Sequence, residues 1–357
     1  MKRRMPISTL AMGLILLVCG VSPGDAYLLE NFEFPNDLSG WTPGSGAWSH
    51  EPSQGFLGLG AAKVASVVGA NSLSQCAELK GLATGDGLRF LAFARAENHT
   101  NPVQVSLEVF TTTDCTGGAV ETYHRQVDSP TMASWTQINV VNSLPAGSVF
   151  SVRAWVTAHA TSAGEITLFD FVSVTDNLAP NPDFTDNLEG WEAGPYSWSH
   201  EPADGLGTPL GSAEVVVDIP DCGAGNSCAF LSKCVNLDTA PRTPFYFGSG
   251  EFKALDVAET YVAAFLLYPE AGCGGTLITQ AAADANVQQV GVWERFSTSF
   301  AVPKEVKSVG IFVGTNDSTL GSRFRVDNVF LVPSARNEVF FDGFESGVTS
   351  AWSSTVP

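Results

Sequence analysis

The sequence predicts an all-β protein built from two tandem β-sandwich domains of the jelly-roll type. Two observations carry this prediction: a stretch of sequence that occurs twice, and short runs in which apolar and polar residues alternate. The length of 357 residues allows about two domains of roughly 150 residues each. We expect a signal peptide at 1–26, a first module at 27–176, a second module at 177–335 and a C-terminal tail at 336–357.

The N-terminus has the layout of a secretory signal peptide. Lys2, Arg3 and Arg4 precede an apolar run at residues 10–21, and small residues stand before a cleavage point after Ala26. The run is too short to span a bilayer. The sequence therefore predicts a secreted, extracellular protein, and leaves open whether it stays associated with the cell surface.

A duplicated stretch defines the two modules. Residues 31–55 and 181–205 align without a gap and share 12 of 25 residues. Both contain the sequence Trp-Ser-His-Glu-Pro, at 48–52 and at 198–202. Such a match indicates an internal duplication, so the two modules should share one fold.

Cysteine spacing supports the same repeat. Of the six cysteines after the leader, four form two pairs with the same separation of 39 residues, one pair in each copy. In an exported protein an even number of cysteines favours disulfides over metal binding. The third pair encloses a small insertion loop of the second copy; it could hold a metal, but no histidine accompanies it. We expect disulfides Cys76–Cys115, Cys222–Cys228 and Cys234–Cys273.

Alternation predicts strands along both copies. Apolar residues occupy every second position from Leu88 to Ala94 and from Val103 to Val109. The second copy has an apolar, β-prone run at 261–268, and the two copies close alike at 166–174 and 324–332. No convincing amphipathic helix occurs in either copy. Many short strands in units of this size favour a two-sheet sandwich or jelly roll.

Charge and motifs argue against several classes of function. The formal net charge is −19, so a nucleic-acid backbone would be repelled. The five histidines are scattered, and no His-Glu-x-x-His, Gly-x-Ser-x-Gly or phosphate-binding glycine loop is present. A retaining glycosidase needs two carboxylates about 5 Å apart, and the sequence brings no such pair together. We therefore predict that the protein is not an enzyme.

The repeated box supplies the first candidate ligand residues. Trp48 with His50, and Trp198 with His200, fall on the same side of a strand. Such a pair can stack on a sugar ring and hydrogen-bond its hydroxyls. A scaffold strand would look the same if its Trp covered the core edge and its His satisfied a backbone group.

A second candidate site lies at residues 150–156. One side of this strand is apolar, and the other carries Arg153 and Trp155 beside a serine. On a concave sheet, a polar face with one large aromatic suits sugar binding. The counterparts in the second copy are Gly310 and Phe312, so any site there is altered or lost. An edge Trp packed under a loop is the alternative.

Together these features resemble a known family. The Asn-x-x-Phe opening, the following Gly-Trp, the Gly-containing loop, the Trp that begins a strand before a Pro, and the closing hydrophobic-Asp-x-Val strand resemble carbohydrate-binding modules of families 4, 9 and 22. These are galactose-binding-like jelly rolls. The resemblance covers nearly all of residues 27–335, twice.

The resemblance implies a ligand groove on the concave sheet and a structural Ca²⁺ between the N-terminal segment and the last strand. Calcium prefers six to eight oxygen ligands, carboxylates among them. The alternative is strand-end carboxylates without an ion. The positions matching the family's metal site are Glu33 and Asp170 in the first copy and Asp183 and Asp327 in the second.

The C-terminal tail carries Phe-Phe-Asp-Gly-Phe-Glu-Ser-Gly at 340–347, which resembles tails on exported proteins of Gram-negative bacteria. It is either a tag for export or sorting machinery or the opening of an incomplete third repeat. The sequence as a whole predicts a secreted, non-catalytic protein that binds a polysaccharide or other glycan. The alternative is a structural or adhesive cell-surface protein with no sugar ligand.

Overall fold

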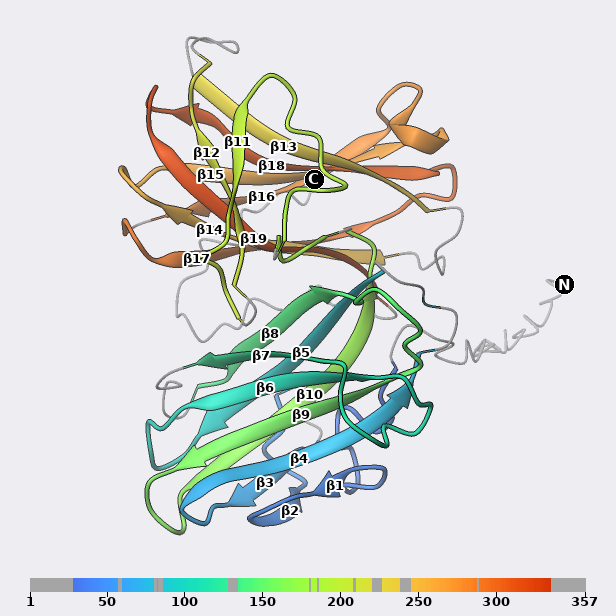
Figure 1. Cartoon of the computed structure of the whole chain (residues 1–357), viewed down its shortest axis with the longest axis vertical. Helices are drawn as coiled ribbons and strands as arrows, with labels where there is room; N and C mark the ends of the chain where they lie inside the picture. The colour runs from blue at the N-terminus through green and yellow to red at the C-terminus, as the bar shows by residue number, and fades with distance from the viewer. Residues whose placement is uncertain are drawn as a thin grey trace, which may run out of the picture.

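The computed structural model describes residues 28–334 apart from 57–59, 80–81, 83–85, 128–133, 180, 185, 208–209, 220–226, 238–244 and 288. Within this part the chain forms two β-sandwiches, module 1 below and module 2 above in Figure 1. The all-β, two-sandwich prediction is confirmed. The expected signal peptide and C-terminal tail lie outside the described residues.

Module 1 consists of two five-stranded sheets in which all strand pairs are antiparallel. Sheet 1A has the order β1 (Thr42–Pro43), β4 (Gly69–Glu78), β9 (Ser151–Ala160), β6 (Val103–Phe110) and β7 (Glu121–Val127). Sheet 1B has the order β2 (Ala47–Glu51), β3 (Ala61–Ala65), β10 (Ile166–Asn177), β5 (Gly87–Ala96) and β8 (Thr136–Ser143).

Module 2 repeats this order. Sheet 2A contains β13 (Ser227–Asn236), β18 (Ser308–Ser318), β15 (Thr260–Tyr268) and β16 (Thr279–Asn286). Sheet 2B contains β11 (Ser197–Glu201), β12 (Ser212–Val216), β19 (Arg323–Ser334), β14 (Phe245–Ala254) and β17 (Trp293–Ala301). A short 3₁₀ turn, η1 (Ala271–Cys273), precedes β16. The shared strands follow the same order, as the duplication predicts, and the place of β1 is taken in module 2 by an isolated bridge between Glu192 and Ser232.

Alternating side chains build the core of each module. Val103, Val105, Leu107 and Val109 on β6 are all 0 % exposed, so one side of sheet 1A faces the interior. The apolar residues of sheet 1B meet them from the other side, and sheets 2A and 2B pack in the same way. Residues between these core positions point to the outer side of the sheet, where Gln104 and Glu108 are partly exposed and Ser106 is 7 % exposed.

The two disulfides expected from the equal spacings are present, Cys76–Cys115 and Cys234–Cys273. Each ties strand β4 or β13 to the loop that follows β6 or β15. For the expected Cys222–Cys228 pair, Cys222 and the Cys228 side chain lie outside the described residues.

The duplication extends to the backbone. In the described part, eight residues other than glycine have positive φ, and they form four matched pairs. Residues other than glycine rarely adopt a positive φ. Because matched positions of both modules adopt it, the surrounding structure enforces it. The pairs are Asn31 with Asn181, Phe34 with Phe184, Cys115 with Cys273, and Phe171 with Asn328.

The two modules meet directly, with no free linker between them. The Leu178 amide donates to the Leu331 carbonyl at 2.9 Å, and the Leu331 amide donates to Asn177 Oδ1 at 3.0 Å. The Arg89 guanidinium lies 4.1 Å from the centre of the Phe330 ring. Since the junction is hydrogen-bonded into β19, the modules have a defined relative orientation.

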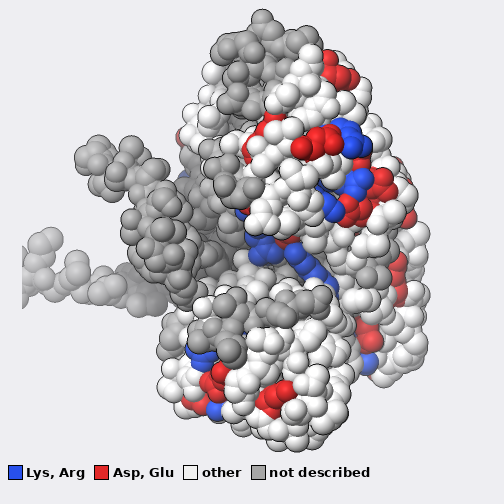
Figure 2. Space-filling model, turned by 90° about the vertical axis from the view of Figure 1, so that its left-hand side faces the viewer, with Lys and Arg blue, Asp and Glu red and all other residues white. Residues whose placement is uncertain are grey.

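A buried ion cluster joins the same two surfaces. Arg125 of β7 in module 1 and Arg295 of β17 in module 2 both donate to Glu251 of β14, whose side chain is 4 % exposed. Figure 2 shows basic side chains in the hollow between the modules. We call the contacts of this paragraph and the preceding one the module joint.

No helix among the described residues is long and apolar enough to cross a bilayer.

Candidate functional site

The outer side of sheet 1A is a polar surface, which we call the polar face. Its residues alternate with the buried core positions of β4, β9, β6 and β7, so they point away from the interior. Most carry a hydroxyl, amide, imidazole or charged group that can hydrogen-bond. The polar face consists of Ser74, Gln104, Ser106, Glu108, His124, Arg153, Trp155 and Thr157.

Strand register places Trp155 at the centre of this face. It pairs with Ser74 of β4 on one side and with Ser106 of β6 on the other, and Ser106 pairs with His124 of β7. We call these four residues the Trp155 row. Neighbouring strands are about 4.8 Å apart, so the indole ring is flanked by hydroxyls within the width of one sugar ring.

The indole ring is held in a fixed orientation. Trp155 Nε1 donates to Glu108 Oε2 at 2.9 Å, and Arg153 Nη1 donates to the same oxygen at 3.4 Å. The Arg153 guanidinium also lies 5.7 Å from the centre of the Trp155 ring. A platform that is ordered before binding loses less conformational entropy when a ligand arrives.

The disulfide forms one end of the polar face. Cys76 pairs with Arg153 in the strand register, and the Cys115 carbonyl accepts a hydrogen bond from Arg153 Nη2. The Cys115 amide in turn donates to Ser151 Oγ at 3.1 Å. The covalent link therefore fixes the loop that positions Arg153.

Module 2 presents a different surface at the same place. Here Phe312 stands in register with Ser232, Ala264 and, one strand further, Ala282. We call these four residues the Phe312 row. Gly310 replaces Arg153, and a Cβ there would lie 3.0 Å from the Phe312 ring, because the ring covers the glycine.

The structure does not bring the repeated box to this face. Trp48 and Trp198 lie on edge strands β2 and β11 and pack against the module cores. The Trp48 ring centre is 6.0 Å from that of buried Phe169, and Trp198 meets Phe324 edge-on at 5.6 Å. These contacts agree with the alternative interpretation, in which the Trp of the box covers the edge of the core.

The two box histidines are half-buried beside these tryptophans. His50 Nε2 lies 2.8 Å from the Phe34 carbonyl oxygen, on a segment with positive φ. His200 occupies the matching position on β11. Of the six candidate ligand residues, Arg153 and Trp155 are the two that lie on the polar face.

Six residues of the polar face were missed in sequence: Ser74, Gln104, Ser106, Glu108, His124 and Thr157. The signal for three of them was the alternation of β6, where polar residues stand between Val103, Val105, Leu107 and Val109. Which neighbouring strands contribute Ser74 and His124 depends on the sheet order, and the sequence does not supply that order.

Buried carboxylates lie at the other candidate sites. Asp170 is 2 % exposed and accepts hydrogen bonds from the Phe56 and Phe171 amides, both at 2.6 Å. The β10–β5 pairing is irregular just after it, so a bulge directs this carboxylate. Glu33, the other predicted ligand of module 1, is 8 % exposed.

Module 2 repeats this arrangement with Asp327 and Asp183. Asp327 is fully buried and accepts from the Leu206 and Asn328 amides. Burial, followed by the nearby Asp183 and Glu251 carboxylates, holds the pKa of Asp327 well above its usual value. Among the described residues, no group of three or more His, Cys, Asp or Glu side chains lies in position to hold a metal ion.

No family model matches the sequence, and no curated protein matches it. Solved structures similar to the chain include carbohydrate-binding modules. The tandem CBM22-1–CBM22-2 domain of Paenibacillus barcinonensis Xyn10C is 15 % identical, with a TM-score of 0.34, over 88 % of this chain and 99 % of that chain.

Two single modules cover 42 % of this chain. They are a family 16 carbohydrate-binding module (15 % identity, TM-score 0.32, 99 % of its length) and TmCBM61 in complex with β-1,4-galactotriose (19 %, 0.31, 98 %). At such TM-scores, none of these likenesses assigns a function to this chain.

Proposed function

We propose that the protein binds a polysaccharide, without catalysis, through the polar face of module 1. The observation that carries this proposal is the Trp155 row, in which one oriented indole lies in register between hydroxyl and imidazole side chains. The apolar face of a pyranose ring can stack on the indole, while its hydroxyls bond to the flanking side chains.

The charge of the surface favours an uncharged glycan. The face carries one Arg and one Glu, and these two are paired with each other. The whole chain has a formal net charge of −19, which opposes the approach of an anionic polymer. A neutral polysaccharide meets no such opposition.

The test is a binding screen of the purified full chain against soluble and insoluble polysaccharides. We expect the wild type to bind at least one neutral glycan. Trp155→Ala should reduce the affinity at least about tenfold, the range of one lost stacking contact and its hydrogen bonds. Phe312→Ala, at the matched position of module 2, is the control and should bind like the wild type. A wild type that binds no glycan would overturn the proposal.

One observation favours the alternative of an adhesive or structural protein. The outer side of sheet 2A carries Val262, Ala264, Leu266 and Phe312, all partly exposed, in place of hydrogen-bonding residues. Apolar surface of this kind suits contact with other proteins. In that case Phe312→Ala, and not Trp155→Ala, should abolish attachment of the protein to cells.

We also propose that the paired carboxylates hold calcium as a structural ion. Glu33 with Asp170, and Asp183 with Asp327, provide hard oxygen ligands beside backbone segments whose unusual φ is enforced. In module 2 the mutual repulsion of Asp183 and Asp327 fits a site that a cation would stabilise. When bound, the ion would balance these charges and tie the N-terminal segment of each module to its last strand.

We propose that the protein is secreted. The Cys76–Cys115 and Cys234–Cys273 disulfides support this, because such bonds persist in oxidising compartments outside the cytosol. The test is to express the whole chain with its first 26 residues and to compare its mature N-terminus with the expected cleavage after Ala26. Recovery of an uncleaved intracellular chain would contradict the proposal.

A further inference from the structure

Strand β7 is the edge strand of the polar face, and a loop of module 2 packs against it. The loop, residues 203–207, comes close to β7 at Gly207. A Cβ at Gly207 would lie 3.2 Å from the His124 carbonyl oxygen and 3.8 Å from Val140 Cγ2. His124 is the last member of the Trp155 row, so module 2 borders the row at this end.

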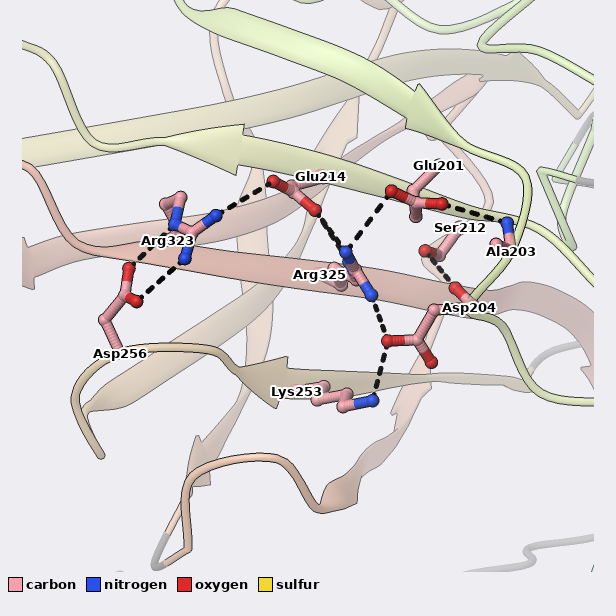
Figure 3. Close-up of polar contacts among 9 residues, drawn as sticks. All are labelled: Glu201, Ala203, Asp204, Ser212, Glu214, Lys253, Asp256, Arg323 and Arg325. Carbon is pink, nitrogen blue, oxygen red and sulfur yellow. Dashed lines mark hydrogen bonds and ion pairs between the residues drawn. The ribbon is translucent and has the colours of Figure 1, made fainter.

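The loop is itself held firmly by sheet 2B. Asp204 is bound by Arg325 Nη1 and, at 2.6 Å, by Lys253 Nζ. Figure 3 shows Arg325 between Glu201, Asp204 and Glu214, and Lys253 reaching Asp204 from the neighbouring strand. Two residues later, the Leu206 amide donates to buried Asp327 at 2.5 Å.

A second contact holds β7 from the same side. Arg125 follows His124 directly, so the two side chains point to opposite sides of the strand. Arg125 forms a bidentate pair with Glu251 of module 2, at 2.8 Å and 3.0 Å. The planar fork of this pair fixes direction as well as distance.

The matched edge strand of module 2 has none of these groups. In register, Ala282 and Ala283 of β16 stand where β7 has His124 and Arg125. Module 1 therefore has both the polar face and the side chains that join its edge strand to the neighbouring module. In module 2 both are replaced.

From this coincidence we propose that module 2 is a positioning element for the ligand face of module 1. Glu251 and the loop at 203–207 hold edge strand β7, and through it His124, at the end of the Trp155 row. The binding unit is therefore the tandem and not module 1 alone. This inference rests on the proposed carbohydrate-binding function of the polar face.

The test compares Glu251→Gln with a matched control, Asp256→Asn. Asp256 also forms a bidentate pair with an arginine, Arg323, at 2.9 Å and 3.0 Å, but that pair is exposed and both partners belong to module 2 (Figure 3). Both variants remove one negative charge: Glu251→Gln removes it from a carboxylate shared by Arg125 and Arg295, and Asp256→Asn from a carboxylate that binds Arg323. Hydrogen exchange is measured in β7 and in β4, and affinity is measured for the glycan that the wild type binds.

We expect Glu251→Gln to speed amide exchange in β7 but not in β4, and to weaken glycan binding at least about fivefold, the lower range of coupling between sites. Asp256→Asn should change neither. If Glu251→Gln does not fold, Arg125→Lys replaces it, since Lys keeps the charge but loses the bidentate geometry.

Unchanged amide exchange in β7 of Glu251→Gln would overturn the inference. Unchanged glycan affinity of Glu251→Gln would also overturn it, provided that Trp155→Ala abolishes binding of the same glycan. If the wild type binds no glycan, the proposed function fails separately. The exchange data then decide whether module 2 holds β7.

Discussion

The Trp155 row of module 1 and the Phe312 row of module 2 occupy the same place in the same fold and have opposite chemistry. Across four strands, module 1 presents Ser, Trp, Ser and His, whereas module 2 presents Ser, Phe, Ala and Ala. Beside the aromatic residue, module 1 has Arg153 and module 2 has Gly310.

Several features of the underlying fold are retained. The disulfide, the left-handed residues and the strand order occur in both modules. The difference shows that the fold restricts inward positions and strained backbone, while outward positions on sheet 1A and sheet 2A are free to diverge. Function should therefore be sought where the two copies differ.

The largest expected effect comes from removing either disulfide. Each closes a loop with a separation of 39 residues, for which the chain-entropy model gives about 4 kcal/mol of stability. Paired Cys→Ser variants of either module should lose this amount in denaturant unfolding. Only the Cys76/Cys115 variant should also lose glycan affinity, because Arg153 bonds to the Cys115 carbonyl. Equal losses of affinity in both variants would erase the distinction between the modules.

The pH dependence of stability tests the module joint. Burial opposes ionisation of Glu251, but the Arg125 and Arg295 charges outweigh it and lower its pKa to about 2. Stability from Glu251 is therefore fully present above its unfolded pKa near 4.5 and is lost as pH falls towards 2.

We expect the stability difference between wild type and Glu251→Gln to be on the order of 3 kcal/mol at neutral pH and to shrink below pH 4.5. Thermal melts from pH 7 to pH 2 measure it. Asp327, whose pKa is raised by burial and by the Asp183 and Glu251 charges, acts in the opposite direction, and its contribution is smaller in Glu251→Gln because one of these charges is gone. A difference that stays constant with pH would rule out this role of the Glu251 charge.

Calcium should raise the melting temperature. At a concentration of one hundred times Kd, a single site adds about 2.7 kcal/mol. In a chain of this size that corresponds to roughly 5 °C or more. Asp170→Asn and Asp327→Asn should each remove part of the shift, and their comparison shows which module binds the ion. EDTA that leaves the wild-type melting temperature unchanged would count against the proposal.

The smallest effect is expected from exchanging the two aromatic residues. Trp155→Phe keeps an aromatic ring but removes the hydrogen bond from Nε1 to Glu108, at 2.9 Å. We expect a loss of affinity of about tenfold, the value of one hydrogen bond to a charged group. Phe312→Trp should not create binding in Trp155→Ala, because Ala264 and Ala282 supply no hydrogen bonds. Isothermal titration of both variants with the glycan that the wild type binds measures these affinities.

Much of the fold could be predicted from sequence because the same sequence pattern occurs in both modules. The repeated box, the equal cysteine spacings and the alternation from Val103 to Val109 each have a local physical cause. Arg153 and Trp155 were found by the same alternation. The box itself attracted attention because it is the longest identical run, yet Trp48 and Trp198 are packed against the cores.

The module joint could not be predicted. Arg125 and Glu251 are 126 residues apart, and their pair has no counterpart elsewhere in the repeat to reveal it. One local signal was present: Glu251 is an acid within the β-prone run at 245–254, where a buried charge needs a partner. Sequence alternation does not identify that partner.

Asn177 gives the tandem a simple hydrodynamic consequence. Its side chain accepts hydrogen bonds from the Ala179 amide at 3.1 Å and from the Leu331 amide at 3.0 Å. The end of module 1 is therefore hydrogen-bonded directly to β19 of module 2. The two sandwiches should therefore tumble as a single particle, with one rotational correlation time for amides of both halves. Small-angle scattering should likewise fit one fixed separation of the two centres of mass.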